Sequence, residues 1–200
     1  MIAFRVLTSY IPQVTNSDRK NVAVFLILAA GFSAAFAREP ADTNYAYYEG
    51  ETYSYTLEAP DKWTLNLEDA YADGYTAALY PEEESYINSK MTIYIWIFKN
   101  DSYTFQDFIS ADSAHYLKED ENLEFWGTDS LGIDSGSYAI ILQLDDPGGA
   151  SELAMIGYIN AVTEIVIFEL HIADRVYFPE ADGKFREALT KFSFPEPEDD

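Results

Sequence analysis

The stretch from Lys90 to Phe98 (KMTIYIWIF) decides the fold of this chain. Side chains of a β-strand point alternately to the two faces of the sheet, so Met91 and the isoleucines face one way while Tyr94, Trp96 and Phe98 face the other. Both faces of the strand are therefore apolar, whereas a sheet with one wet face would alternate between apolar and polar residues. We expect a sheet that is covered on both sides, with helices as the covers.

Further strands are predicted on both sides of this stretch. Alternating or continuous apolar patterns separated by turn residues mark them, at Thr52–Glu58, Trp63–Leu67, Tyr75–Tyr80, Leu123–Trp126, Tyr138–Leu144, Leu153–Ile159 and Thr163–Ile172. Asp73-Gly74 is a turn signal between two of the early strands. The links between the last strands are short, which makes those strands antiparallel neighbours.

Two helices complete the pattern. Thr104 followed by Asp107 resembles a helix cap, and apolar residues then recur at near-helical spacing as far as Lys118, interrupted by Asp112. A second helix follows Pro179, with one apolar face, made of Phe185, Ala188, Leu189 and Phe192. The predicted fold class is α+β: an antiparallel β-sheet flanked by helices on both faces, an α/β/α sandwich.

Residues 1–37 have the three parts of a secretory signal peptide. Arg5, Arg19 and Lys20 supply a basic end, Val22–Phe32 is an apolar core, and Ala35-Phe36-Ala37 is an A-x-A cleavage site. We expect cleavage before Arg38 and an exported protein, periplasmic or extracellular. The alternative is an uncleaved membrane anchor, but a spanning helix needs about 20 apolar residues.

The rest of the chain predicts one domain. Residues 38–50 are polar and turn-rich and are expected to be a flexible leader, residues 51–194 carry the strands and helices, and residues 195–200 form an acidic tail. The chain has no cysteine. This excludes disulfides, a cysteine-linked lipid, thiolate nucleophiles and cysteine–zinc sites, so the apolar core alone must hold the fold.

The charge excludes several partners. The chain has 12 basic and 35 acidic residues, a net charge of −23, and loss of the signal peptide would leave 9 basic against 34 acidic residues, a net charge of −25. Such a field repels nucleic acid and anionic membrane surfaces. A solubilising surface for a salty medium, a cation-binding surface and a docking face for a basic partner remain as interpretations.

Three segments resemble the PsbP-like proteins and their relatives, the DcrB and Mog1 group. They are an aromatic strand that enters a Pro-x-x-Trp turn at Tyr55–Trp63 (YTLEAPDKW), a hairpin strand at Ile156–Asn160 (IGYIN), and a helix end at Leu189–Phe194 (LTKFSF). The resemblance implies a Mog1/PsbP-like α/β/α sandwich over residues 51–194. It also implies an exported or nuclear accessory protein that binds other proteins, without a shared catalytic centre.

The two histidines are the first candidates for chemistry. Glu169 and His171 are two residues apart in a predicted strand, so their side chains share a face and would suit a proton transfer or a metal site. The alternative, which we favour, is that both lie at the solvent-facing end of a strand whose other face is core. His115 lies near the end of the first predicted helix, where a histidine complements the helix dipole.

Two groups of residues are candidates for binding. Tyr45, Tyr47 and Tyr48 precede the first predicted strand and would suit contact with a protein or a sugar ring, or else packing within the fold. Four carboxylates in predicted loops offer oxygen ligands for calcium: Asp129, Asp134, Asp145 and Asp146. Their spacing does not match a known calcium-loop pattern, so we expect no metal and no cofactor.

These patterns favour an exported, non-enzymatic accessory or binding protein whose partner is another protein. It would contact this partner through an acidic, aromatic-rich surface. The alternatives are a small-ligand or carbohydrate binder that uses the tyrosine cluster, and a hydrolase that uses Glu169 and His171.

Overall fold

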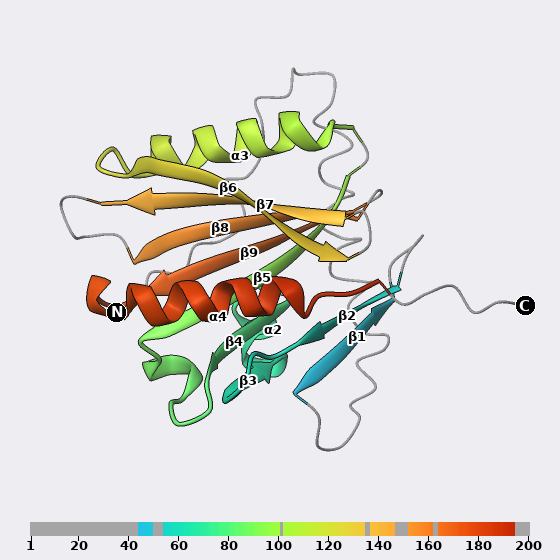
Figure 1. The fold of residues 1–200 in the computed structure, drawn as a ribbon, viewed down its shortest axis with the longest axis vertical. Coiled ribbons are helices and arrows are strands. Elements are labelled where there is room, and N and C mark those ends of the chain that lie inside the picture. The colour runs from blue at the N-terminus through green and yellow to red at the C-terminus, as the bar shows by residue number, and fades with distance from the viewer. Residues whose placement is uncertain are drawn as a thin grey trace, which may run out of the picture. The chain divides into compact units, whose positions relative to one another are not determined.

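Two strands that pair along their whole length form the centre of the structure. In the computed structural model, which describes residues 44–49, 54–100, 102–134, 137–146, 152–161 and 164–194, β5 (Met91–Lys99) runs antiparallel to β9 (Glu164–Ile172) from the pair Met91/Ile172 to the pair Lys99/Glu164. The other strands of this sheet are β3 (Trp63–Asn66), β4 (Ala77–Pro81), β6 (Glu124–Asp134), β7 (Ser137–Asp145) and β8 (Leu153–Asn160). The seven strands are all antiparallel, in the order β3-β4-β5-β9-β8-β7-β6 (Figure 1).

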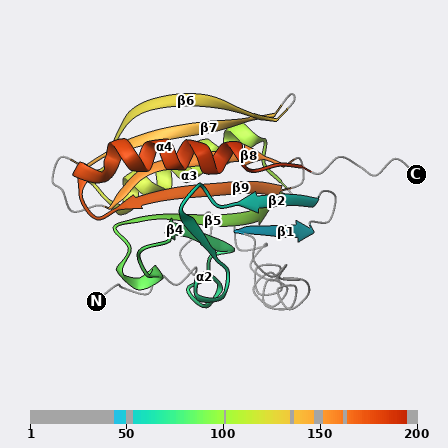
Figure 2. The same ribbon diagram turned by 60° about the horizontal axis from the view of Figure 1, so that its bottom comes forward.

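Helices cover both faces of this sheet. Helix α3 (Phe105–Glu119) begins at Thr104, whose side-chain oxygen accepts from the backbone N–H of Asp107 at 3.2 Å, as the capping pattern predicts. Helix α4 (Phe178–Thr190) lies on the opposite face, so that Figure 2 shows α4 in front of the sheet and α3 behind it. The predicted α+β class, an antiparallel sheet with helices on both faces, is confirmed.

Three short helical turns complete the secondary structure: α2 (Glu68–Ala72), η2 (Tyr86–Asn88) and η3 (Arg175–Tyr177). The predicted turn at Asp73-Gly74 is the end of α2, where Gly74 has a φ of 92°, a conformation that glycine adopts without a steric penalty. The sequence does not predict α2, because five residues are too few to show a helical period. None of the helices in the described residues combines the length and apolar character that a membrane span needs.

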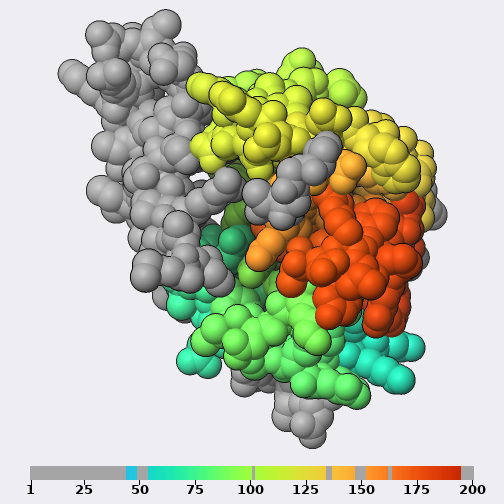
Figure 3. All heavy atoms as spheres, turned by 90° about the vertical axis from the view of Figure 1, so that its left-hand side faces the viewer, coloured from blue at the N-terminus to red at the C-terminus, as the bar shows by residue number. Residues whose placement is uncertain are grey.

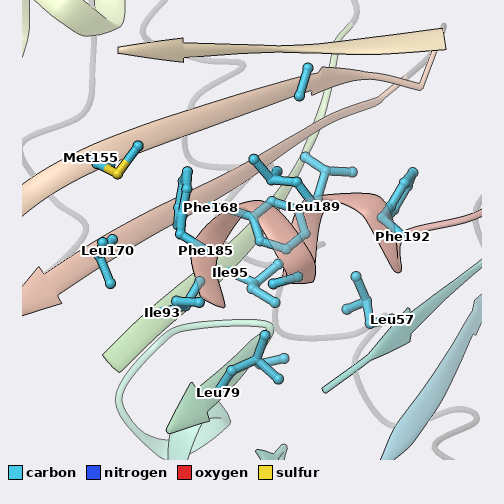
Figure 4. Packing of buried hydrophobic residues seen from close by; sticks show 14 of the residues in the cluster. Leu57, Leu79, Ile93, Ile95, Met155, Phe168, Leu170, Phe185, Leu189 and Phe192 are labelled. Atoms are coloured by element: carbon cyan, nitrogen blue, oxygen red, sulfur yellow. The ribbon is translucent and has the colours of Figure 1, made fainter. Parts of the chain in front are cut away.

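The α4 face of the sheet holds the larger apolar core. Figure 4 shows Phe185, Leu189 and Phe192 of this C-terminal segment directed toward the strands, where they meet Phe168 and Ile95. All five side chains are at most 1% exposed. Burial of this kind supplies the main stabilising free energy in a chain that has no disulfide.

Gly157 of β8 lets α4 approach the sheet closely. A Cβ atom at this position would lie 3.1 Å from both Leu189 Cδ2 and Phe185 Cζ, nearer than side-chain atoms normally come. The contact partners are themselves fully buried, so they have little room to move. The glycine in the segment Ile156–Asn160 is therefore a packing requirement of the α4 face.

We predict that Gly157→Ala destabilises the protein by about 1–3 kcal/mol, because the added methyl group overpacks the contact with α4. Gly183, on α4 itself, is the matched control, because a Cβ atom there would meet nothing within 4 Å. Gly183→Ala should stabilise the protein by about 0.5–1 kcal/mol through helix propensity. Urea unfolding of the two variants measures both effects, and equal effects would contradict the packing role of Gly157.

The predicted leader contains a strand. Tyr45–Glu49 form β1, which pairs antiparallel with β2 (Ser54–Glu58) in a separate two-stranded sheet. Tyr48 stacks on Tyr55 with ring centroids 4.9 Å apart, and Tyr55 contacts Phe192 of the core. The prediction of a flexible leader is wrong for residues 45–49, because their tyrosines pack on an aromatic cluster that the local sequence does not reveal. The predicted signal peptide (1–37) and acidic tail (195–200) lie outside the described residues.

Candidate functional site

Glu169 and His171 lie on the face of β9 that α3 covers. This face begins with Ile165 and Ile167, which belong to the apolar core beneath α3, and continues with the two polar residues. Glu169 is only 3% exposed. The favoured prediction that both residues face solvent is therefore wrong for Glu169, because α3 reaches over this part of the strand.

The Glu169 carboxylate has a partner for each of its oxygens. Tyr116 of α3 donates its hydroxyl hydrogen to Oε1, and Oε2 lies 3.1 Å from Nε2 of His171. These hydrogen bonds offset the cost of burying a carboxylate. The carboxylate in turn orients the imidazole ring, whose side chain is 25% exposed. The pair is thus a fixed carboxylate–histidine dyad at the edge of the α3 core.

A second buried carboxylate lies on the same side of the sheet. Asp112 of α3 is 3% exposed and accepts a hydrogen bond of 2.8 Å from the hydroxyl of Tyr158 in β8. Asp112 is the residue that interrupts the apolar stripe of the predicted helix. The interruption was therefore a signal of a buried polar contact, although the sequence alone did not identify the partner.

Aromatic rings continue the α3 face beyond the helix, over β4 and β5. Tyr75 stacks on Tyr94 at a centroid distance of 4.2 Å and on Trp96 at 4.9 Å. Tyr94 also meets the His171 ring edge to face at 5.1 Å. The dyad and this half-buried aromatic group form one continuous region.

Burial governs the protonation of these tyrosines. It raises the pKa of Tyr94, an effect that a hydrogen bond with Thr92 opposes and that the carboxylates of Asp73, Glu152 and Glu169 reinforce. Burial also raises the pKa of Tyr86, which donates its hydroxyl hydrogen to Asp73 Oδ2 at 2.8 Å. Both phenols remain neutral hydrogen-bonding groups far above neutral pH.

The structure does not gather the three N-terminal tyrosines on one surface. Neighbouring residues of a strand face opposite ways, so Tyr48 packs toward the core while Tyr45 and Tyr47 share the other face of β1 with Glu58 and Thr56 of β2. Tyr47 is 45% exposed. Of the three predicted contact residues, Tyr47 is thus exposed, with the half-buried Tyr45 on the same face of β1.

The four candidate calcium ligands are not brought together. Asp129 lies within β6 rather than in a loop, and a hydrogen bond of 2.8 Å from Arg186 lowers its pKa. Asp145 ends β7 and lies 3.4 Å from Arg175, and Asp146 is buried. Asp134 ends β6, and its side chain lies outside the described part of the chain. Within the described ranges, no group of three or more potential ligands is placed to hold a metal ion.

His115 lies in the last turns of α3, where the sequence predicts it, and its Nε2 is 3.7 Å from the carboxylate of Glu119 one turn later. Sequence reasoning missed another residue, Trp126 of β6, which is 70% exposed. The position of Trp126 next to polar, turn-like residues was the available signal, since a tryptophan rarely stays exposed without a reason.

Comparison with solved structures places this architecture in a class. The chain has a PsbP-like fold. It is similar to the solution structure of cyanobacterial PsbP (CyanoP) from Synechocystis sp. PCC 6803, with a TM-score of 0.51 and 11% sequence identity over 82% of this chain and 99% of CyanoP. No protein-family model matches the chain, and no curated protein sequence matches it. The likeness shows the fold, and the DcrB and Mog1 part of the resemblance stays a prediction.

We predict that Tyr116→Phe destabilises the protein by about 1–3 kcal/mol, because the buried Glu169 carboxylate loses a hydrogen-bond donor. Tyr103→Phe is the matched control, since Tyr103 is 47% exposed at the other end of α3, and its effect should stay within about 0.5 kcal/mol. Urea unfolding at neutral pH compares the two. Equal stability of both variants would show that Glu169 does not depend on Tyr116.

We also predict that stability falls as the pH rises above about 10, the usual pKa of tyrosine in an unfolded chain. Burial raises the pKa of Tyr55, as it does that of Tyr94, so the folded state keeps protons that the unfolded state has lost. Unfolding then releases protons and becomes more favourable with increasing pH. Tyr94→Phe should make this decline shallower, whereas Tyr71→Phe, at a residue that is 55% exposed, should not. Urea midpoints between pH 8 and 11 provide the measurement, and parallel curves would contradict the prediction.

Proposed function

We propose that the chain is an exported, non-enzymatic accessory protein that binds another protein through an acidic, aromatic-rich surface. The observation that carries this proposal is the outer face of β1, where Tyr45 and Tyr47 lie side by side along the strand opposite Glu58 and Thr56. Tyrosine contributes a large amphipathic contact area with little conformational entropy to lose. Export rests on the predicted signal peptide, and the mature protein would begin at Arg38.

The charge of the chain defines the partner more closely. A net charge of −23 favours a partner with a basic face, both by attraction at long range and by discrimination against acidic proteins. Lys191, a basic side chain beside β2, is already paired, since it lies 3.0 Å from Glu58 and 3.4 Å from Glu187. The PsbP-like resemblance, which implies an accessory role, supports the same proposal.

Two features weigh against the alternative functions. A sugar or small-ligand site built from the tyrosine cluster would use the three tyrosines together, but Tyr48 faces the core. One pocket within the described part of the chain, lined by Phe105, Ser137, Tyr138 and Asn160, has a volume of about 120 Å³, below the roughly 300–1,000 Å³ of typical ligand pockets. A hydrolase of the triad type could use a buried carboxylate to orient its histidine, but it also needs a nucleophile bonded to that histidine. Among the described residues, the hydrogen bonds of His171 are to Glu169 alone.

We predict that the double variant Tyr45→Thr/Tyr47→Thr loses at least about tenfold in affinity for the partner, as expected when two aromatic contact residues are truncated. Threonine retains the strand preference that β1 requires. Tagged wild-type protein and variants are expressed with the signal sequence, and proteins captured in the exported fraction are compared by mass spectrometry. Tyr71→Ala, at an exposed tyrosine on α2, is the matched control.

A protein captured by the wild type and by Tyr71→Ala, and lost in the double variant, supports the proposal. If the double variant still captures the protein, β1 is not part of the contact surface. If no protein is captured and a sugar raises the melting temperature in a thermal-shift screen, the carbohydrate-binding alternative replaces the proposal.

A further inference from the structure

The outer strand β6 presents an uncovered aromatic and acidic surface. On the side of the sheet where α3 lies, Thr128 and Ser130 of β6 are exposed, which shows that the helix does not extend over this strand. Strand β6 is at one end of the strand order, and Figure 2 shows it at the outer edge of the sheet. By the register, Phe125 points to the α3 side with Leu144, whereas Glu124 and Asp145 of β7 point to the other side of the sheet. We call these three residues, Phe125, Glu124 and Asp145, and Trp126, at the exposed start of the edge strand, the β6 surface.

A β-bulge presents Trp126. The pairing with β7 passes from Phe125/Leu144 to Gly127/Gln143, so Trp126 has no residue opposite it in the ladder. Its side chain is 70% exposed, and that of Phe125 is 36% exposed. Tryptophan is enriched among the residues that dominate binding energy at protein interfaces.

Two carboxylates face each other beside this tryptophan. Glu124 pairs with Asp145 across the strands, an arrangement in which like charges repel. Arg175 lies 3.4 Å from Asp145, so the pair is only partly compensated. The preceding turn adds two further acids, Asp120 and Glu121. In Figure 3, which shows the end of the molecule where α3 finishes and β6 begins, the yellow atoms of this turn and strand lie at the surface.

We propose that the β6 surface binds an arginine- or lysine-rich segment of another protein, with one cation held between the Trp126 ring and the Glu124 carboxylate. A cation over the face of a tryptophan is attracted by the ring quadrupole, and it relieves the repulsion between Glu124 and Asp145. Binding of a second copy of this chain is disfavoured, because it would bring two acidic surfaces together. The inference rests on the proposed function in that it assumes a protein partner, and it adds the chemistry of that partner and a contact surface separate from β1.

The test uses the full-length exported protein and a fluorescently labelled octapeptide of alternating arginine and serine, read by fluorescence anisotropy. The whole chain is acidic and attracts any basic peptide. Matched variants therefore separate this general attraction from binding at the β6 surface. Trp126→Ala should raise the dissociation constant about tenfold and Glu124→Gln about threefold. Tyr71→Ala and Glu83→Gln, at an exposed tyrosine and an exposed carboxylate elsewhere, should change it less than about twofold. A counterpart peptide with glutamine in place of arginine should not bind.

Equal losses in Glu124→Gln and Glu83→Gln, or no loss in Trp126→Ala, would overturn the assignment and leave only general charge attraction. A dimer in sedimentation equilibrium that Trp126→Ala dissociates would overturn it in favour of a second copy. Melting temperatures of the variants, expected to match the wild type because the substituted side chains are exposed, exclude misfolding as the cause.

The outcome also separates this inference from the proposed function. If partner capture depends on Tyr45 and Tyr47 while the dissociation constant of the peptide is unchanged in Trp126→Ala, only the β6 assignment fails. If no partner protein is captured while peptide binding depends on Trp126 and Glu124, the proposed role of the β1 tyrosines fails and the β6 assignment stands.

Discussion

The burial of β8 and β9 on both faces is the constraint on which the rest of the structure depends. Every residue of β9 except His171 and every residue of β8 except Asn160 is buried. Strands of this kind need an apolar cover on each side. The chain has no cysteine to provide a covalent alternative, so α3 and α4 must both pack on the sheet for the domain to be stable.

The two covers differ in chemistry, and this difference determines where polar function can lie. On the α4 side the contact is apolar and close, with Phe185 and Leu189 directly over Gly157. On the α3 side the contact includes two buried carboxylates, Glu169 and Asp112, each bonded to a tyrosine across the helix–sheet boundary. A buried carboxylate without its donor is strongly destabilising, so the two tyrosine–carboxylate pairs fix the position of α3 along the strands more narrowly than apolar packing alone would.

The sequence was sufficient for the parts of the fold that are governed by local periodicity. The two-faced pattern of residues 90–98 predicted β5 and its covers, and the cap at Thr104 predicted the start of α3. Burial of Glu169 was not predictable, because the two faces of a strand look alike until the reach of the covering helix is known. The strand β1 was missed because its stabilising contacts, from Tyr48 to Tyr55 and on to Phe192, join residues that are far apart in the sequence. The sequence predicts loops at Asp129 and Asp134, whereas both residues lie in β6. This edge strand is exposed on the side that α3 leaves open, and it therefore carries the polar composition of a turn.

This last point explains why an edge strand can carry recognition in such a fold. An edge strand presents unpaired backbone groups, and proteins protect it with charges and bulges against pairing with another copy. Strand β6 has both protections, with bulges after Phe125 and after Gly132 and acidic residues at Glu124 and Asp129. Neither protection requires an exposed tryptophan, which by itself would favour aggregation. Trp126 is therefore the feature of β6 that protection does not explain, and an acidic edge that repels its own copies while exposing an aromatic ring is suited to a basic partner.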